Sequence, residues 1–265
     1  MKQKTGCTMT FIPLHAFSDN YIWIIQEKDS SLIWAVDPGD AEVVSQYCDT
    51  HHLDLAGILI THHHKDHTGG VAQLKARYQC QVYGPEHLAP MVTHPLHEGD
   101  CVEVFARSFR VLETPGHTLD HLCYFSDQDT PVLFSGDTLF RGGCGRIMEG
   151  NPEQMLAAMN KLAALPDDTL IYCTHEYTLA NYRFALHLDQ HNNALLEAQK
   201  DSQQIRQQNN VTLPSTLRLE KQTNPFLRTH IPALVGQAAA QLNETMATDN
   251  VAAFSQVRRA KDTFS

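Results

Sequence analysis

The chain has 265 residues, 42% of them hydrophobic and 19% charged, which is enough to bury a sizeable core in one large domain or two smaller ones. Its formal net charge of −10 disfavours nucleic acid as a partner, so positive contacts to an anionic substrate must be local. The seven cysteines are widely spaced and form no Cys-x-x-Cys pair, which argues against a disulfide framework or a thiolate zinc finger.

The N-terminal segment gives no sign of export. Met1 to Thr10 is polar with two lysines, and no stretch of the chain is apolar enough to span a bilayer. We therefore expect a cytoplasmic protein without a membrane partner.

Strand and helix signals alternate through the first two thirds of the chain. Runs rich in β-branched and aromatic residues predict strands at 21–25, 32–36, 56–60, 80–83, 101–105, 108–113, 121–126, 131–135 and 169–173. Helices are predicted at 41–52, 71–78 and 152–165. Beyond about residue 175 strand signals become scarce, and helical patterns run at 176–190, 192–209, 231–242 and 249–261. We predict a mixed β/α domain at 1–173 and a mostly helical C-terminal domain at 174–265.

A cluster of histidines follows the predicted strand at 56–60. Four histidines and one aspartate fall within residues 62–67. A solvated histidine-rich loop is the alternative, but packed histidines repel when protonated and need hydrogen-bond partners when buried, so metal binding explains the cluster better. His62 and His64 point the same way in an extended segment, whereas His63 points oppositely and is left out.

Three more metal-binding side chains stand directly after predicted strands. They are His117, Asp137 and His175. Together with the cluster they give seven candidate ligands: His62, His64, Asp66, His67, His117, Asp137 and His175. Seven ligands are too many for one tetrahedral zinc ion but suit two ions bridged by the carboxylate of Asp137. Oxygen and nitrogen ligands leave zinc, iron and manganese open.

These motifs, in this order, resemble the metallo-β-lactamase superfamily. The resemblance implies an α+β fold, a four-layer αββα sandwich with two metals at one edge. It also implies that His62, His64 and His117 hold the first metal, that Asp66, His67 and His175 hold the second, and that Asp137 bridges them. The lactamases most alike in site layout have a cysteine at the position of Asp137, so β-lactam hydrolysis is disfavoured.

Further segments resemble the glyoxalase II (hydroxyacylglutathione hydrolase) family over almost the whole chain. The matching segments are Asp19-Asn20-Tyr21, the Gly-rich loop at 137–146 with two arginines, His175-Glu176-Tyr177 and Arg258-Arg259-Ala260-Lys261-Asp262. The resemblance implies that Arg146, Tyr177, Arg258 and Lys261 bind glutathione, whose two carboxylates suit Arg and Lys partners. Many relatives have an aromatic residue where Met148 stands, so one contact is missing or replaced.

The activity implied by this resemblance is hydrolysis of S-D-lactoylglutathione to D-lactate and glutathione, the second step of methylglyoxal detoxification. A hydroxide bridging two divalent metal ions, zinc by preference, would attack the thioester, and Asp66 would orient it as well as bind metal. We expect His121 to support the site without binding metal and Cys144 to have no chemical role. The expected partner is a small glutathione thioester, and the expected state is a monomer.

Three other functions fit parts of the pattern. A persulfide dioxygenase of the same superfamily would use one iron and have a shorter C-terminal region, whereas this chain has seven ligands and a long helical end. A nuclease would need an extended basic stripe that this acidic chain lacks. A non-catalytic binding module would leave the ligand set unexplained.

Overall fold

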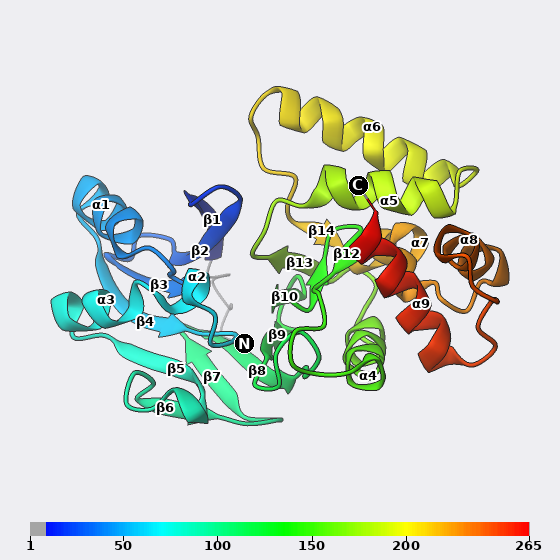
Figure 1. Cartoon of the computed structure of the whole chain (residues 1–265). Coiled ribbons are helices and arrows are strands. Elements are labelled where there is room, and N and C mark those ends of the chain that lie inside the picture. Colours follow the sequence, from blue (N-terminus) through cyan, green and yellow to red (C-terminus); the bar gives the residue numbers. More distant parts are fainter. Residues whose placement is uncertain (1–8, 265) are drawn as a thin grey trace, which may run out of the picture.

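The structure is a computed structural model that describes residues 9–264 (Figure 1). Most of the polar segment Met1 to Thr10, together with Cys7, therefore lies outside the described residues. Within residues 9–264, no helix combines the length and apolar character needed to cross a membrane. The six cysteines of this part are all free thiols.

The first sheet is built from the N-terminal strands in chain order. It contains β1 (Met9–Ala16), β2 (Asn20–Glu27), β3 (Leu32–Val36), β4 (Asp54–Leu59), β5 (Gln81–Pro85) and β6 (His94–Leu96). The β1, β2 and β3 strands run antiparallel, whereas β3 to β6 pair in parallel. The parallel strands need crossover connections, which α1 (Ala41–His51) and α3 (Val71–Tyr78) provide.

The second sheet has the order β14-β13-β10-β9-β8-β7. Its strands are β7 (Cys101–Val104), β8 (Arg107–Glu113), β9 (Leu122–Ser126), β10 (Val132–Gly136), β13 (Leu170–Cys173) and β14 (Ser215–Thr216). A small hairpin of β11 (Leu139–Phe140) and β12 (Gly143–Cys144) follows β10. The crossover from β10 to its parallel neighbour β13 contains α4 (Pro152–Ala163), whose Asn151 and Gln154 form a capping box.

The remaining helices lie in the C-terminal part of the chain. They are α5 (Thr178–Leu188), α6 (Asn193–Gln207), α7 (Leu217–Thr223), α8 (Pro232–Leu242) and α9 (Asn250–Thr263). The short helix α2 (Lys65–Thr68) lies in the histidine cluster, and 3-10 turns occupy Glu86–Leu88 (η1) and Pro225–Leu227 (η2).

The two sheets and the helices outside them form four layers, and the alternating side chains of the strands fill the cores between these layers. On β2, Tyr21, Trp23 and Ile25 face a core between the sheets. Ile22 and Ile24 of the same strand face a second core beneath α1 and α3. Because successive side chains of β2 alternate and both faces of the strand are buried, another layer must cover the outer face of its sheet. Figure 1 shows the resulting order of helix, sheet, sheet and helix.

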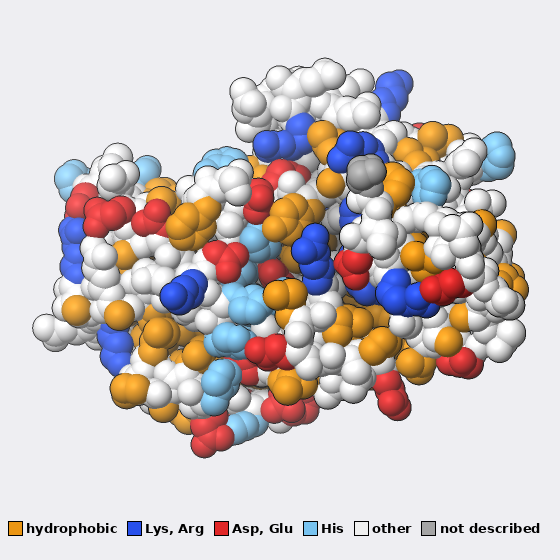
Figure 2. Space-filling model, viewed as in Figure 1, with side chains coloured by type: hydrophobic (Ala, Val, Ile, Leu, Met, Phe, Trp, Pro, Cys, Tyr) orange, Lys and Arg blue, Asp and Glu red, His pale blue; other side chains and the backbone are white. Residues whose placement is uncertain are grey.

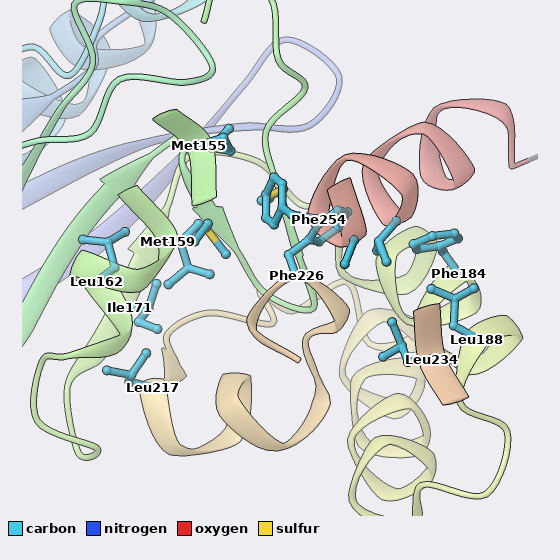
Figure 3. Packing of buried hydrophobic residues seen from close by; sticks show 14 of the residues in the cluster. Met155, Met159, Leu162, Ile171, Phe184, Leu188, Leu217, Phe226, Leu234 and Phe254 are labelled. Atoms are coloured by element: carbon cyan, nitrogen blue, oxygen red, sulfur yellow. The ribbon is translucent and has the colours of Figure 1, made fainter. Parts of the chain in front are cut away.

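A third core joins the second sheet to α4 and to the C-terminal helices. In Figure 3, Phe226 and Phe254 lie between the α4 methionines and the side chains of Phe184 and Leu188 on α5. The ring centroids of Phe226 and Phe254 are 5.7 Å apart, a distance typical of attractive aromatic pairs. The C-terminal part also supplies β14, which pairs antiparallel with β13, so the two parts of the chain share a sheet and a core.

The predicted order of elements agrees with the structure, with some omissions. The strands at 32–36 and the helix at 71–78 have the predicted bounds, and most others differ by one to three residues. The strands β1, β6 and β14 and the helix α7 were not predicted, because they are short or carry mixed polar and apolar residues. The predicted loop at 137–146 contains the β11–β12 hairpin.

Candidate metal centre

The seven candidate ligands meet at one edge of the two sheets. They follow the ends of β4, β8, β10 and β13, the four strands after which the sequence shows metal-binding residues. Six of the seven have ligand atoms in two groups, each with all its atoms within 4.8 Å of one another. One group is His62, His64 and His117; the other is Asp66, His67 and His175.

The first group is arranged as ligands of one ion. Nδ1 of His64 and Nε2 of His117 face each other at 3.1 Å, close to the spacing of about 3.3 Å between two nitrogens on a tetrahedral zinc. His62 is fully buried, yet its Nε2 has no hydrogen-bond partner. A buried nitrogen without a partner costs free energy unless a ligand satisfies it, so this group fits a metal ion.

The second group has the same character. Oδ2 of Asp66 lies 3.3 Å from Nε2 of His67 and 3.5 Å from Nε2 of His175. His67 is also fully buried, and its Nε2 has no hydrogen-bond partner. Two imidazoles and one carboxylate directed at one point suit a second divalent ion.

Asp137 lies between the two groups. Its Oδ2 is 3.4 Å from Nε2 of His117, whereas its Oδ1 is 3.4 Å from Nε2 of His175 and 3.6 Å from Nε2 of His67. The hydroxyl of Thr174 donates to Oδ1 at 2.6 Å. Each carboxylate oxygen therefore faces a different group, which is the arrangement that a bridging ligand requires.

The second ring nitrogen of three histidines is held by a protein oxygen. Nδ1 of His67 lies 3.1 Å from Oδ2 of Asp37, and Nδ1 of His175 lies 2.8 Å from Oδ1 of Asp19. Nδ1 of His117 lies 2.8 Å from the carbonyl oxygen of Arg146. Such contacts fix the tautomer and leave Nε2 free to bind metal.

Asp37 and Asp19 are positioning residues that sequence analysis missed. Residue 37 falls between the predicted strand at 32–36 and the predicted helix at 41–52, and no role in the site was predicted for it. Asp37 is nevertheless buried and also accepts from the backbone N–H of Thr61 at 2.7 Å and from its hydroxyl at 2.6 Å. Asp37 directly follows the buried strand β3, and an acidic residue at such a strand end is the sequence signal that could have identified it.

The protonation states of the ligand side chains suit the binding of metal cations. Burial lowers the pKa of His62 and of His64, which keeps both rings neutral as metal ligation requires. Burial also opposes ionisation of His67, but the carboxylates of Asp137 and Asp37 outweigh it and raise the His67 pKa well above its ordinary value. In the metal-free protein a proton on His67 thus balances these carboxylates, and a metal ion would replace it.

His121 supports the bridge residue from behind. Its Nε2 accepts the backbone N–H of Asp137 at 3.0 Å, and burial, aided by the nearby His117, lowers its pKa to about 3. Gly136 has φ +48°, and a Cβ there would lie 2.6 Å from Nε2 of His121. The expectation that His121 supports the site agrees with this geometry.

His63 faces away from both groups, as the alternation of an extended segment predicts. Its Nδ1 lies 3.0 Å from Oδ1 of Asp120, and its Nε2 lies 3.2 Å from Oε1 of Glu149.

A cavity of about 440 Å³ opens beside the metal groups. His117 and Asp137 form part of its wall. All four residues implied by resemblance to bind glutathione also line it: Arg146, Tyr177, Arg258 and Lys261. Figure 2 shows histidines in the middle of this face and Lys and Arg side chains to their right, over the C-terminal helices.

The cationic side chains near the cavity differ in how free they are. The side chain of Arg146 is 74% exposed, whereas that of Arg258 is 6% exposed. Arg258 donates to the carbonyl oxygen of Cys144 at 3.0 Å and to Oδ1 of Asp262 at 2.8 Å. Of the two arginines in the Gly-rich loop at 137–146, Arg141 does not line the cavity, because it is buried and donates to the hydroxyl of Tyr182 at 3.0 Å.

Four other lining residues differ in their surroundings. The ring of Tyr177 stacks on His175 with centroids 4.8 Å apart, and Lys261 donates to the carbonyl oxygen of Ala180 at 3.2 Å. Met148 is exposed and lines the cavity. Burial raises the pKa of the Cys144 thiol to about 11, which agrees with the expectation of no chemical role.

Comparisons with known proteins agree with this geometry. Residues 36–175 match the Metallo-beta-lactamase superfamily, and residues 176–264 match the family described as Hydroxyacylglutathione hydrolase C-terminus. A hydroxyacylglutathione hydrolase of Marinomonas sp. (strain MWYL1) is 65% identical over 97% of this chain and 100% of its own length.

Two solved structures share the fold. ETHE1 from Myxococcus xanthus is 26% identical, with a TM-score of 0.62 over 83% of this chain and 84% of its own. TTHA1623, solved in a di-iron-bound form, is 26% identical, with a TM-score of 0.58 over 82% of this chain and 100% of its own.

The fold and the paired His/Asp groups define a metallo-β-lactamase-type protein with a site for two divalent metal ions. The match through the C-terminal helices and the identity over the whole chain narrow the assignment. The chain belongs to the hydroxyacylglutathione hydrolase (glyoxalase II) family.

Proposed function

We propose that this protein hydrolyses S-D-lactoylglutathione, and related S-2-hydroxyacylglutathione thioesters, to the 2-hydroxy acid and glutathione. This reaction is the second step of methylglyoxal detoxification. One observation carries the proposal: a single cavity is lined by His117 and Asp137 of the metal groups, by Tyr177, which stacks on His175, and by the cations Arg146 and Lys261. A cavity of this kind can hold a thioester at the metals while an anionic group lies among the cations.

The ligand assignment is part of the proposal. His62 through Nε2, His64 through Nδ1 and His117 through Nε2 hold one ion. Asp66, His67 and His175 hold the other, and Asp137 bridges them. Zinc is the preferred metal, although nitrogen and oxygen ligands also accept iron and manganese. Two such ions supply a water-derived nucleophile at neutral pH and stabilise negative charge on the carbonyl oxygen.

The chain positions the reactants for this chemistry. Asn20 donates to Oδ2 of Asp66 at 3.0 Å, which holds the carboxylate beside the metal groups, where we assign it the additional task of orienting the attacking water. Arg146 and Lys261 bind the glutathione carboxylates, and Arg258 holds the wall between them by its contact with Cys144. Glutathione leaves as a thiolate with little acid help, because a thiol has a pKa of about 8.5.

The proposal extends to the organisation of the chain. Residues 1–173 form the catalytic domain, and residues 174–265 form the helical domain that contributes to substrate binding. We assign a cytoplasmic monomer whose partner is a small glutathione thioester, with no nucleic acid or membrane partner. The formal net charge of −10 supports the absence of a nucleic acid partner.

The test is a hydrolysis assay with S-D-lactoylglutathione, before and after treatment with a chelator. We expect turnover that is lost on chelation and restored by added Zn²⁺. A fully metal-loaded protein without thioesterase activity would contradict the proposal. One iron per chain with oxygen uptake on glutathione persulfide would favour the dioxygenase, which the match to the hydroxyacylglutathione hydrolase C-terminus disfavours.

A further inference from the structure

A third group of side chains that could bind a metal ion lies at the same edge of the sheets, on the far side of the histidine loop. His63 lies between β4 and α2, and His87 lies on the 3-10 turn η1. Asp120 comes from the loop between β8 and β9, and Glu149 comes from the segment before α4. All four line an open hollow of about 550 Å³. His63 and His87 belong to the half of the chain that forms the first sheet. Asp120 and Glu149 belong to the half that forms the second sheet.

The distances within this group are those of a ligand set. Oδ1 of Asp120 lies 3.0 Å from Nδ1 of His63, and Oδ2 lies 3.4 Å from Nε2 of His87. Neighbouring ligands on a tetrahedral zinc ion are separated by about 3.3 Å. His63, His87 and Asp120 each offer one ligand atom, and these atoms all lie within 4.8 Å of one another. Glu149 lies at the other ring nitrogen, with Oε1 3.2 Å from Nε2 of His63, so this carboxylate can orient the ring rather than bind the same ion.

One carboxylate oxygen of Asp120 is left without a hydrogen bond. The side chain of Asp120 is 9% exposed, and its Oδ2 is buried and accepts no hydrogen bond. An ion pair between His63 and the two carboxylates explains the other contacts of the group. It does not explain why a buried oxygen directed at His87 has no donor, since such an oxygen pays the cost of lost hydration.

We propose that His63, His87 and Asp120, with Glu149 beside them, form a third site for a divalent transition-metal ion. Two neutral imidazoles and the Asp120 carboxylate would bind the ion, and the nearby Glu149 carboxylate would complete the balance of its +2 charge. Imidazole ligands favour Zn²⁺, Co²⁺ or Ni²⁺ over Ca²⁺ and Mg²⁺, which prefer oxygen. The site is separate from the pair of ions beside the cavity, because it uses none of their ligands and His63 points away from them. An ion here links loops from both halves of the αββα sandwich.

The third site can be counted directly. The enzyme already loaded with two metal ions is dialysed to equilibrium against increasing ZnCl₂, and bound zinc per chain is measured by elemental analysis. We expect a third equivalent to bind to the wild type and to be lost in His87→Gln, with the first two ions retained. His87 has a 54% exposed side chain and is not a residue of the catalytic cavity, so the substitution leaves the two-metal site and the fold intact.

His191→Gln is the matched control, because it removes an exposed histidine elsewhere, between α5 and α6, and should still bind three ions. A wild-type protein that saturates at two ions would overturn the proposal. So would a third ion that persists in His87→Gln, or one that His191→Gln removes instead.

Cobalt gives a second, spectroscopic measurement. Titration of Co²⁺ into the two-metal protein should produce new visible absorption at the third equivalent, because nitrogen ligands of low symmetry intensify these bands. The new absorption should be absent in His87→Gln and should persist in the presence of a tenfold excess of Ca²⁺. Its loss on addition of Ca²⁺ would mean that oxygen ligands alone form the site, contrary to the proposal.

Discussion

The two ends of the cavity are built in different ways. At the metal end, the ligands follow four strand ends, and all of them except His64 and Asp66 are buried. Protein oxygens hold the second nitrogens of His67, His117 and His175. At the other end, Arg146 is largely exposed, and Lys261 extends from the C-terminal helix α9. Internal hydrogen bonds therefore hold the metal end before any substrate arrives, whereas at the cationic end the exposed side chain of Arg146 can still adjust.

This difference separates the chemistry from the choice of substrate. The strand ends of the sandwich position the ligand side chains, and a fold of this kind can serve different substrates when the residues around its site change. The helical C-terminal part covers one side of the cavity and supplies Arg258 and Lys261, whereas Arg146 comes from the loop between β12 and α4. Changes at the metal end should therefore affect every substrate, and changes at the cationic end should affect only substrates that carry the glutathione carboxylates.

The largest effect should come from the bridge. Asp137→Ala removes the carboxylate that faces both groups, so we expect loss of bound metal and a fall in turnover of more than about 10²-fold on every thioester. Metal analysis and hydrolysis assays measure the two effects. Asp129→Ala, which changes an aspartate in the turn before β10, is the control. If the Asp137→Ala variant keeps its full metal content and its activity, Asp137 does not bridge the two ions.

A smaller effect should follow from changing Asp37, which holds the His67 ring in place. Asp37→Asn keeps the shape and tolerates the left-handed φ of +52° at this position, but it weakens the contact to Nδ1 of His67. We expect metal affinity or turnover to fall by about 10-fold to 100-fold. Chelator titration compared with the wild type measures the affinity. An unchanged metal affinity and turnover would show that His67 needs no brace.

At the cationic end the effect should depend on the substrate. Arg146→Ala and Lys261→Ala should each raise KM for glutathione thioesters by about 10-fold, the lower range for a lost charge-assisted hydrogen bond. The KM for a small thioester without glutathione should not change. Arg258→Ala combined with Lys261→Ala should raise KM further, but Arg258 also holds Cys144 and Asp262, so its stability must be checked by thermal unfolding. Equal effects on both substrates would contradict the division between the two ends.

The smallest effect is a pH dependence. Burial, aided by the nearby Arg258 and Arg183, lowers the pKa of Lys261 to about 8. The side chain is therefore charged below pH 8 and loses its charge above it, so KM for glutathione thioesters should rise a few-fold between pH 7 and pH 9. In Lys261→Arg the charge persists at high pH, and this rise should disappear. A wild-type KM that stays constant across this range would exclude a binding role for the Lys261 charge.

Local sequence was sufficient for the main elements and for the candidate ligands. Strands such as Leu32–Val36 were predicted because buried strands are dense in β-branched and aromatic residues. The opposite directions of His62 and His63 followed from the alternation of an extended chain. Short strands such as Ser215–Thr216 were missed, because their pairing with β13 depends on residues more than forty positions away.

The sequence by itself determined which side chains with metal-binding chemistry follow each strand, since strand and ligand are neighbours along the chain. It did not determine how distant side chains use one another. Asp19 reaches His175 across 156 positions, and Arg258 reaches Cys144 across 114. Only the packing of the two sheets and the C-terminal helices decided that Asp37 supports His67, that Arg141 turns away from the cavity and that Asp120 has a buried oxygen without a donor. These outcomes depend on burial and on hydrogen-bond geometry, which a local pattern of residues does not specify.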